Sequence, residues 1–189
     1  MPQITIFFIW ALWIISWMVA AQWSRRTERR APFGEEFISR VFTIIGALMM
    51  FGLYSPRYVS VLALWRVSDA TGWLLAIVTA GGFLFSWWAR IHLGSLWSST
   101  VTLKEGHHVV NTGPYRIVRH PIYTGIIVAT FATAIDKGTY VAIAGSVLML
   151  VGWFIKARVE ERFLRSQLGA DAYDAYARKT AMLIPFVRV

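Results

Sequence analysis

The stretch Gly113–Gly125, GPYRIVRHPIYTG, follows a polar run and leads directly into an apolar one. Pro114 and Pro121 interrupt regular helix on either side of Tyr115–His120, because proline lacks an amide hydrogen and restricts the residue before it. Pro121 suits the first turn of a helix, where that hydrogen is not needed. The stretch therefore predicts a rigid polar loop at the N-terminus of an apolar helix.

The chain around this loop is too apolar for a soluble domain of its length. Of the 189 residues, 57% are hydrophobic, 15% are charged and ten are tryptophans. A domain of this size has too little interior to hide so much apolar surface from water. We therefore predict an all-α integral membrane protein.

Five apolar segments approach the roughly 20 residues that cross a bilayer. The four longer ones are Ile4–Trp23, Phe37–Tyr54, Gly72–Trp88 and Thr139–Ile155. The fifth, Ile122–Ile135, is short enough to be re-entrant or interfacial, but residues 136–138 favour a tight hairpin with the next segment. We expect about five transmembrane helices in a single membrane domain. Residues 1–90 would hold the first three, and residues 91–189 the catalytic loop, the helical hairpin and a C-terminal region at the cytosolic face.

The basic residues give an orientation. If the N-terminus is outside, all but three of the 19 Lys and Arg residues fall on the cytosolic side; the exceptions are Arg57, Arg66 and Lys137. This bias is the one that the positive-inside rule describes. It also explains the net charge of +9 through topology and contacts to membrane lipids, so we expect no nucleic-acid partner.

Several kinds of site are absent from the sequence. The chain has no cysteine, which excludes disulfides, thiolate metal ligands and cysteine nucleophiles. The four histidines form no HExxH, and we expect no metal. No GxGxxG follows a strand, and neither a Walker loop nor a GxSxG elbow is present. Any chemistry must therefore use Arg, His, Glu and Tyr side chains at the cytosolic face.

The tail after the last apolar segment carries an unusual acidic pair, Glu160 and Glu161. These residues could simply pair with neighbouring arginines on a solvated helix, where such pairs contribute little. Four residues at roughly helical spacing then predict one amphipathic helix lying on protein or lipid: Leu164, Leu168, Tyr173 and Tyr176. The run Ile184–Phe186 forms an apolar end.

These motifs together resemble the isoprenylcysteine carboxyl methyltransferase family of integral-membrane enzymes. The resemblance rests on H-x-V-V-x-x-G-P-Y-R-x-x-R-H-P-x-Y-x-G, followed by E-E, L-G-x-x-x-Y-x-x-Y and I-P-F. It extends from Arg90 to Phe186, whereas the first two apolar segments match only as hydrophobic helices. The chain departs from the family at Thr180–Met182, where a basic residue and a proline are usual.

The resemblance implies S-adenosylmethionine as cofactor and assigns a site. The cofactor-binding residues would be His107, Val109, Val110, Gly113, Tyr115, His120, Pro121, Tyr123 and Glu160. The residues needed for catalysis would be Arg119, Glu160 and Glu161. We expect Arg119 to hold an acceptor carboxylate through two hydrogen bonds and so to orient it.

The implied acceptor is a lipidic or prenylated small molecule, with carboxyl O-methylation of a prenylcysteine-like carboxylate as the main expectation. N-methylation of a phospholipid or other amine remains open, and His107, His108 or Glu160 could accept the proton that an amine must lose. Two other classes remain as alternatives: an NADPH-dependent enzyme resembling sterol reductases and a membrane scaffold without activity.

Overall fold

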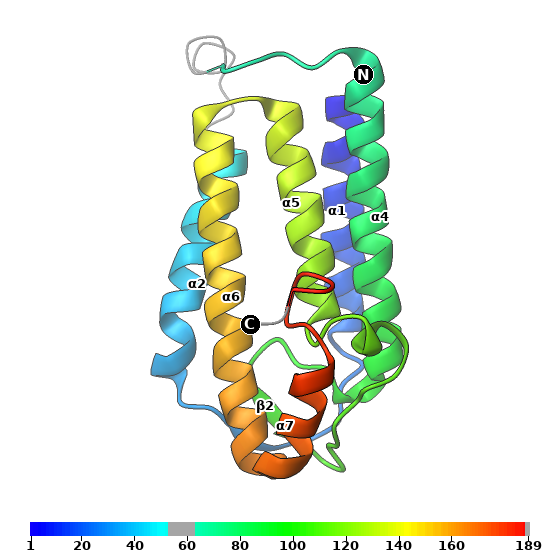
Figure 1. The fold of residues 1–189 in the computed structure, drawn as a ribbon. Helices are drawn as coiled ribbons and strands as arrows, with labels where there is room; N and C mark the ends of the chain where they lie inside the picture. The colour runs from blue at the N-terminus through cyan, green and yellow to red at the C-terminus, as the bar shows by residue number, and fades with distance from the viewer. Residues whose placement is uncertain (53–62, 188–189) are drawn as a thin grey trace.

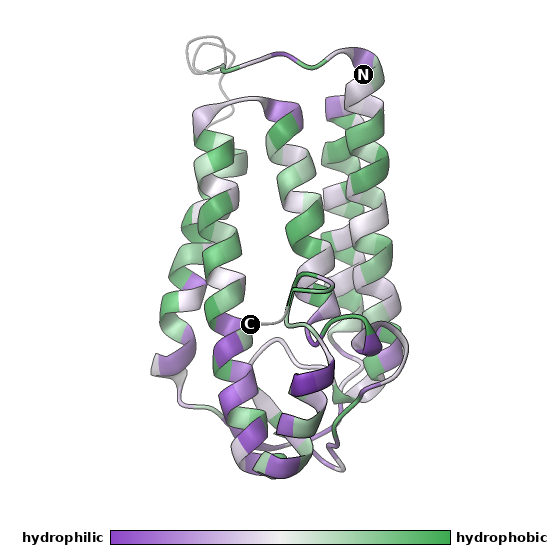
Figure 2. Cartoon of the chain, in the orientation of Figure 1, coloured by the Kyte–Doolittle hydropathy of each residue, from purple (hydrophilic) through white to green (hydrophobic). Residues whose placement is uncertain are grey.

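The fold is a bundle of long helices (Figure 1) with a small polar region at one end (Figure 2). The computed structural model describes residues 1–52 and 63–187. Within these residues the long helices are α1 (Pro2–Ala20), α2 (Phe33–Ala47), α4 (Asp69–Leu93), α5 (Pro121–Lys137) and α6 (Tyr140–Leu168). A π-helical turn, η1 (Leu48–Gly52), extends α2. The predicted helical class is confirmed.

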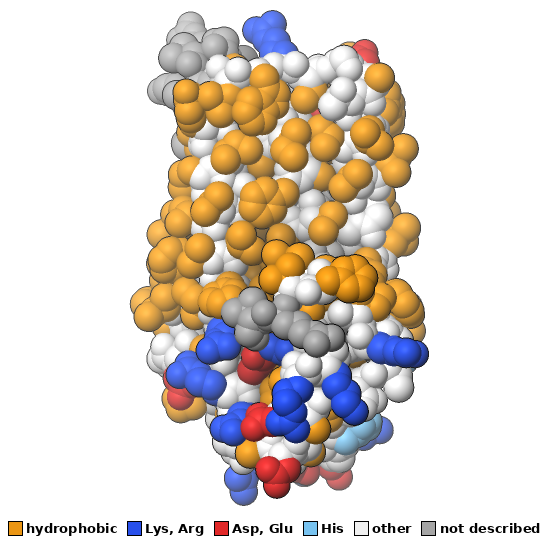
Figure 3. Space-filling view, in the orientation of Figure 1, with side chains coloured by type: hydrophobic (Ala, Val, Ile, Leu, Met, Phe, Trp, Pro, Cys, Tyr) orange, Lys and Arg blue, Asp and Glu red, His pale blue; other side chains and the backbone are white. Residues whose placement is uncertain are grey.

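The outer surface of the bundle is apolar. Large hydrophobic side chains of every long helix are exposed, among them Leu12 and Leu84, each 70% exposed. Figures 2 and 3 show this belt along the helices and the charged side chains gathered below it. Three helical stretches have the length and composition of a membrane span: Pro2–Ala20, Asp69–Leu96 and Tyr140–Leu168. The chain is therefore a membrane protein, while the number of five crossings stays a prediction.

The predicted hairpin at residues 136–138 is present. Gly138 ends α5 in the left-handed conformation, with φ 58°, and Thr139 caps α6 by accepting a hydrogen bond from the Ala142 amide at 3.2 Å. Pro121 lies in the first turn of α5, also as predicted. The last two residues of the second predicted span, residues 53–54, and Arg57 lie outside the described residues.

Small residues bring the helices together in two close pairs. A Cβ on Gly82 of α4 would lie 2.6 Å from the Gly125 carbonyl of α5, and Ser86 donates to the Ile122 carbonyl at 3.0 Å. A Cβ on Gly46 of α2 would likewise lie 2.5 Å from the Gly145 carbonyl of α6. Backbones approach this closely where small residues replace bulky ones, as is common between membrane helices. The bundle thus consists of an α4–α5 pair and an α2–α6 pair, with α1 packed on α4.

The polar end contains a short sheet that the sequence did not predict. Strand β1 (Thr27–Arg30) pairs antiparallel with β2 (Thr102–Lys104). Both strands come from connections between helices and are too short to give an alternating pattern. Their pairing joins the connection after α1 to the one after α4.

The prediction of one amphipathic tail helix was wrong. Helix α6 continues to Leu168, well beyond the apolar segment, and ends at Gly169, whose φ is 96°. A separate helix, α7 (Ala170–Lys179), follows. The reason is that glycine adopts this backbone conformation easily, so the chain reverses there and folds α7 back toward the bundle.

Candidate functional site

An open cavity lies where the polar end meets the apolar belt. Its walls combine apolar and aromatic side chains, such as Leu96, Trp97 and Tyr115, with a few polar groups. Concave sites with this mixed lining are typical of small-molecule sites. The described residues contain no group of three or more His, Cys, Asp or Glu side chains that could hold a metal ion.

Most of the predicted site residues lie around this cavity. They are His107, Val109, Val110, Tyr115, Arg119, His120, Pro121, Tyr123 and Glu160. The four residues of the tail stripe, Leu164, Leu168, Tyr173 and Tyr176, also line it, although they belong to two helices. The structure therefore brings the loop, the start of α5, the end of α6 and α7 to one place.

Two predicted site residues, Gly113 and Glu161, are not among the residues that line the cavity. Gly113 has a φ of 56°, and a Cβ there would lie 2.7 Å from the ring of His92. His92 in turn shares a 2.8 Å hydrogen bond with Thr112. Glycine is therefore required at this turn by its conformation and by the neighbouring ring. Glu161 lies behind the cavity wall, against Arg119.

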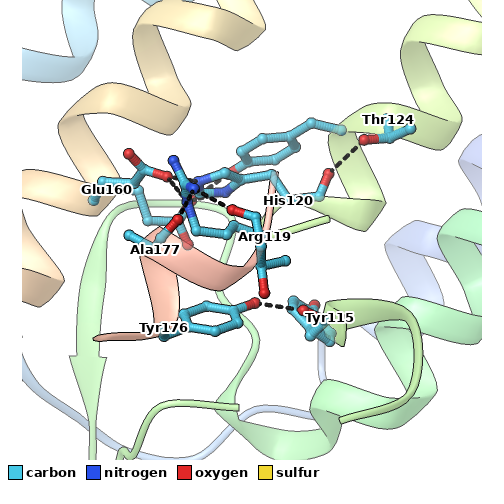
Figure 4. Close-up of polar contacts among 10 residues, drawn as sticks. Tyr115, Arg119, His120, Thr124, Glu160, Tyr176 and Ala177 are labelled. Atoms are coloured by element: carbon cyan, nitrogen blue, oxygen red, sulfur yellow. Dashed lines mark hydrogen bonds and ion pairs between the residues drawn. The ribbon is translucent and has the colours of Figure 1, made fainter. Parts of the chain in front are cut away.

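Arg119 connects α6 to the end of the chain. Its side chain is 4% exposed, and its Nε donates to Glu161 Oε1 at 2.6 Å. Its Nη1 donates to the carbonyl of Ala177 at 3.0 Å and to that of Thr180 (Figure 4). A two-point contact with a carboxylate uses either Nε or Nη1 together with Nη2, so it would displace one of these partners. The geometry therefore favours a positioning role for Arg119 over the acceptor contact that we predicted.

The two glutamates of the acidic pair differ in environment. Glu160 lines the cavity, its side chain is 31% exposed, and its Oε2 accepts a 2.7 Å hydrogen bond from the Tyr123 hydroxyl. Glu161 is 12% exposed and lies within 3.2 Å of His120 Nε2 as well as bonding Arg119. The rings of His120 and Tyr123 stack, with centroids 5.4 Å apart. Glu160 is thus the carboxylate that can meet a ligand, and Glu161 holds the wall in place.

The chain end docks through its backbone. The amides of Arg119 and His120 donate to the carbonyls of Ala181 at 2.8 Å and Met182 at 3.1 Å. The Tyr176 hydroxyl donates to the Tyr115 carbonyl at 2.7 Å, which fastens α7 to the loop (Figure 4). Because main-chain groups make the first two bonds, the departure from the family pattern at Thr180–Met182 leaves this docking in place.

Burial sets the charge of His107. Burial lowers the pKa of His107 below its usual value of about 6.5, and the nearby Glu160 carboxylate only partly opposes that shift. Its Nδ1 accepts a hydrogen bond from the Lys104 amide at 3.4 Å, which fits a neutral ring. Burial also raises the pKa of Tyr115 well above its usual range. Near neutral pH the cavity wall therefore presents an uncharged imidazole and a protonated phenol.

The sequence analysis missed Trp97 and the residue that fixes it, Arg90. Arg90 is fully buried, and its guanidinium donates to the carbonyls of Gly94, Ala20 and Trp23 at 2.6, 2.7 and 2.8 Å. It also lies 4.6 Å from the ring centroid of Trp97, which lines the cavity. Arg90 thus joins the C-terminal ends of α1 and α4. The only signal in the sequence is an arginine inside an apolar helix shortly before a tryptophan.

The part of the chain that forms most of this site matches a known family. Residues 74–166 match the family model of the isoprenylcysteine carboxyl methyltransferases. Over this segment, just under half of its length, the chain is similar to the isoprenylcysteine carboxyl methyltransferases. The matched segment begins in α4 and ends in α6, so it contains the polar loop, α5 and both glutamates.

Individual relatives agree with this family. A rice protein (Oryza sativa subsp. indica) named "Probable protein-S-isoprenylcysteine O-methyltransferase" is 29% identical over 113 residues, which cover 60% of this chain and 53% of the relative. The protein-S-isoprenylcysteine O-methyltransferase of Schizosaccharomyces pombe is 33% identical over 104 residues, or 52% and 43% of the two chains. Methanethiol S-methyltransferase 1 of Bradyrhizobium diazoefficiens is 27% identical over 162 residues, or 78% and 53%. The chain spans about half the length of these relatives.

Proposed function

We propose that the protein is an S-adenosylmethionine-dependent methyltransferase that acts on a lipidic or amphipathic acceptor. The single observation that carries the proposal is the position of the cavity. The cavity lies at the polar end of an apolar bundle, and most of its lining comes from the segment that matches the family. A site at the boundary between water and the membrane interior can bind a polar cofactor that enters from water and an apolar acceptor that enters from lipid.

The residues around the cavity suit S-adenosylmethionine. The cofactor supplies a methyl group on a positively charged sulfur, which is already activated for transfer. Trp97 and Tyr115 offer aromatic faces for an adenine ring or a cation, and the Glu160 carboxylate can accept hydrogen bonds from ribose hydroxyls or an ammonium group. The N-terminus of α5 favours a carboxylate.

In this proposal the polar residues at the cavity have separate roles in binding and positioning. Tyr123 orients the Glu160 carboxylate through its 2.7 Å hydrogen bond. A neutral His107 keeps a positive charge away from the cationic cofactor. Arg119 and Glu161 act as positioning residues that hold α7 over the cavity. Methyl transfer to an ionised carboxylate needs no general base, so correct placement of the two reactants supplies most of the rate.

For the acceptor we propose a prenylcysteine-like carboxylate, in agreement with the names of the rice and Schizosaccharomyces pombe relatives. The Bradyrhizobium relative, whose name specifies a thiol acceptor, covers more of this chain and supports a small thiol as the second candidate. We further propose five crossings with the N-terminus outside and the cavity at the cytosolic face. The apolar lengths of α2 with η1 and of α5, and the charges gathered around the cavity, support that topology.

The test is methyl transfer by the purified protein in lipid nanodiscs. Labelled S-adenosylmethionine is offered with a prenylated cysteine analogue, a phosphatidylethanolamine or a small alkyl thiol. We expect a base-labile methyl ester on the prenylcysteine analogue, and loss of transfer in Glu160→Gln but not in the exposed control Glu105→Gln. Binding of NADPH without binding of S-adenosylmethionine would instead favour the reductase alternative, and binding of neither the scaffold.

A further inference from the structure

The last described residues, Ile184–Val187, form a short apolar projection that we call the C-terminal hook. The residues before it, Ala181, Met182 and Leu183, are buried against the bundle. In the hook, by contrast, Ile184 is 60% exposed and Phe186 is 97% exposed. The proposed enzymatic function uses none of these side chains.

The backbone of the hook is unusual. The Val187 amide donates to the Ile184 carbonyl at 3.1 Å, which closes a turn with Pro185 and Phe186 as its central residues. Phe186 has a φ of 68°, in the left-handed region. Proline followed by a left-handed residue is the pattern of a type II turn, in which glycine or asparagine normally takes the second central position. A bulky residue is disfavoured there, so the turn holds an aromatic ring outward in a conformation that costs energy.

The hook projects from the bundle surface at the level of the apolar belt. Leu183 packs in a cluster with Ala157 of α6 and with Tyr123 and Ile127 of α5. The Thr124 hydroxyl of α5 donates to the Leu183 carbonyl at 2.7 Å. The hook therefore emerges between the apolar parts of α5 and α6, and in Figures 1 and 3 it lies at the lower edge of the belt, above the charged side chains.

Charged residues next to the hook suit the same surroundings. Arg178 and Lys179 are exposed at the end of α7, just before the buried stem, and Arg116 is exposed near Val118, which bridges to Ala181. Basic side chains beside an apolar anchor are attracted to anionic lipid headgroups. Aromatic and aliphatic side chains at this depth lie in the boundary between headgroups and acyl chains.

We infer that the C-terminal hook inserts into the bilayer leaflet on the cavity side and anchors the tail to the membrane. Arg119 and His120 hold the stem of the hook through their amides, and Arg119 also bonds Ala177 of α7. Lipid contact at the hook is thereby connected to the helix that covers the cavity. The partner of this surface is the lipid bilayer itself.

The absence of native cysteine allows a direct test with a single labelled thiol. A fluorophore is attached at Val187→Cys, which keeps Phe186 native, and the full chain is placed in bilayers of phosphatidylcholine and phosphatidylglycerol with brominated acyl chains. Leu84→Cys, exposed on α4, reports the membrane interior, and Ala172→Cys, exposed on α7, reports water. We expect quenching at position 187 to be several-fold stronger than at 172 and close to that at 84.

Two further substitutions in the Val187→Cys background test whether the apolar side chain at position 186 causes the quenching, or whether the label is quenched merely because it lies near the membrane. Phe186→Leu should keep the quenching, whereas Phe186→Asp should reduce it to the level of position 172. Equal quenching at 187 and 172, or no change with Phe186→Asp, would overturn the inference. Protection from aqueous iodide without quenching by brominated lipid would also overturn it, because a second copy would then cover the hook. The readout needs no methyl transfer, so its failure is distinguishable from failure of the proposed enzymatic function.

Discussion

Replacing Arg119 should release the tail from the bundle. Arg119→Ala removes the bond to Glu161 and those to the carbonyls of Ala177 and Thr180, all largely out of water. Breaking a buried charge pair from one side typically costs about 3–5 kcal/mol. Because 1.4 kcal/mol is a factor of ten, the population with an undocked tail should rise on the order of a hundredfold or more. The remaining contacts of α5 and α6 keep the bundle folded.

Hydrogen–deuterium exchange measures this release directly. In Arg119→Ala the amides of α7 should exchange much faster, while those of α4 and α5 stay protected. Arg119→Lys keeps a charge near Glu161 but cannot reach both carbonyls, so we expect an intermediate effect. Arg116→Lys is the matched control, since Arg116 is exposed on the same loop.

The alternative role for Arg119, contact with the acceptor, gives a different result. Arg119→Lys would then raise KM for the acceptor and leave both the exchange of α7 and the affinity for S-adenosylmethionine unchanged. Protected α7 amides in Arg119→Ala would refute the positioning role outright.

The remaining predictions concern the cavity and the helix packing. Glu160→Gln should weaken S-adenosylmethionine binding by about tenfold or more in calorimetry, because a hydrogen bond to a charged group contributes about 1.5–3 kcal/mol; unchanged affinity would remove Glu160 from the site. Burial disfavours the charged form of His107, so its ring stays neutral until the pH falls below about 6.5. Affinity for the cationic cofactor should accordingly be flat from pH 8 to about 6.5 and fall below that range, and His107→Gln should flatten the fall; a midpoint above pH 7 would contradict this. Gly82→Ala should lower the melting temperature by crowding α5, at a cost of about 1–3 kcal/mol, whereas Gly81→Ala, whose Cβ meets no atom within 4 Å, should not; equal melting temperatures would contradict the close packing of α4 and α5.

Local signals in the sequence were sufficient to predict where some helices begin and end. Pro121 at the start of α5 and Gly138 at its end act through their own backbone conformations, so the sequence predicted both positions correctly. The prediction that the loop binds the cofactor came from the resemblance to the family, whereas the position of α7 at the cavity was not predicted. The tail was harder, because Gly169 can either interrupt a helix or remain within it, and only the docking of α7 decides between these outcomes.

Other features depend on contacts between distant residues. Glu160 and Glu161 are neighbours, so they point to different sides of α6, and the rotation of that helix in the bundle decides which one faces the cavity. Besides Glu161, the partners of Arg119 are carbonyls of the tail, which no side-chain pattern reveals. Arg90 looked like a topology signal for the same reason, since its partners are the main-chain ends of α1 and α4.

The pairing of α2 with α6 has a consequence for how the protein is made. Gly46 and Thr43 of α2 fit against Gly145 and Gly152 of α6, which lie near the other end of the chain. At synthesis rates of about 5–20 residues per second, α2 leaves the ribosome on the order of ten seconds before its partner. If α2 crosses the bilayer, as we propose, its small-residue face meets lipid or the insertion machinery during that interval. In the five-crossing topology that we propose, the α5–α6 hairpin therefore packs on α2 in a late assembly step, after α2 has already entered the bilayer.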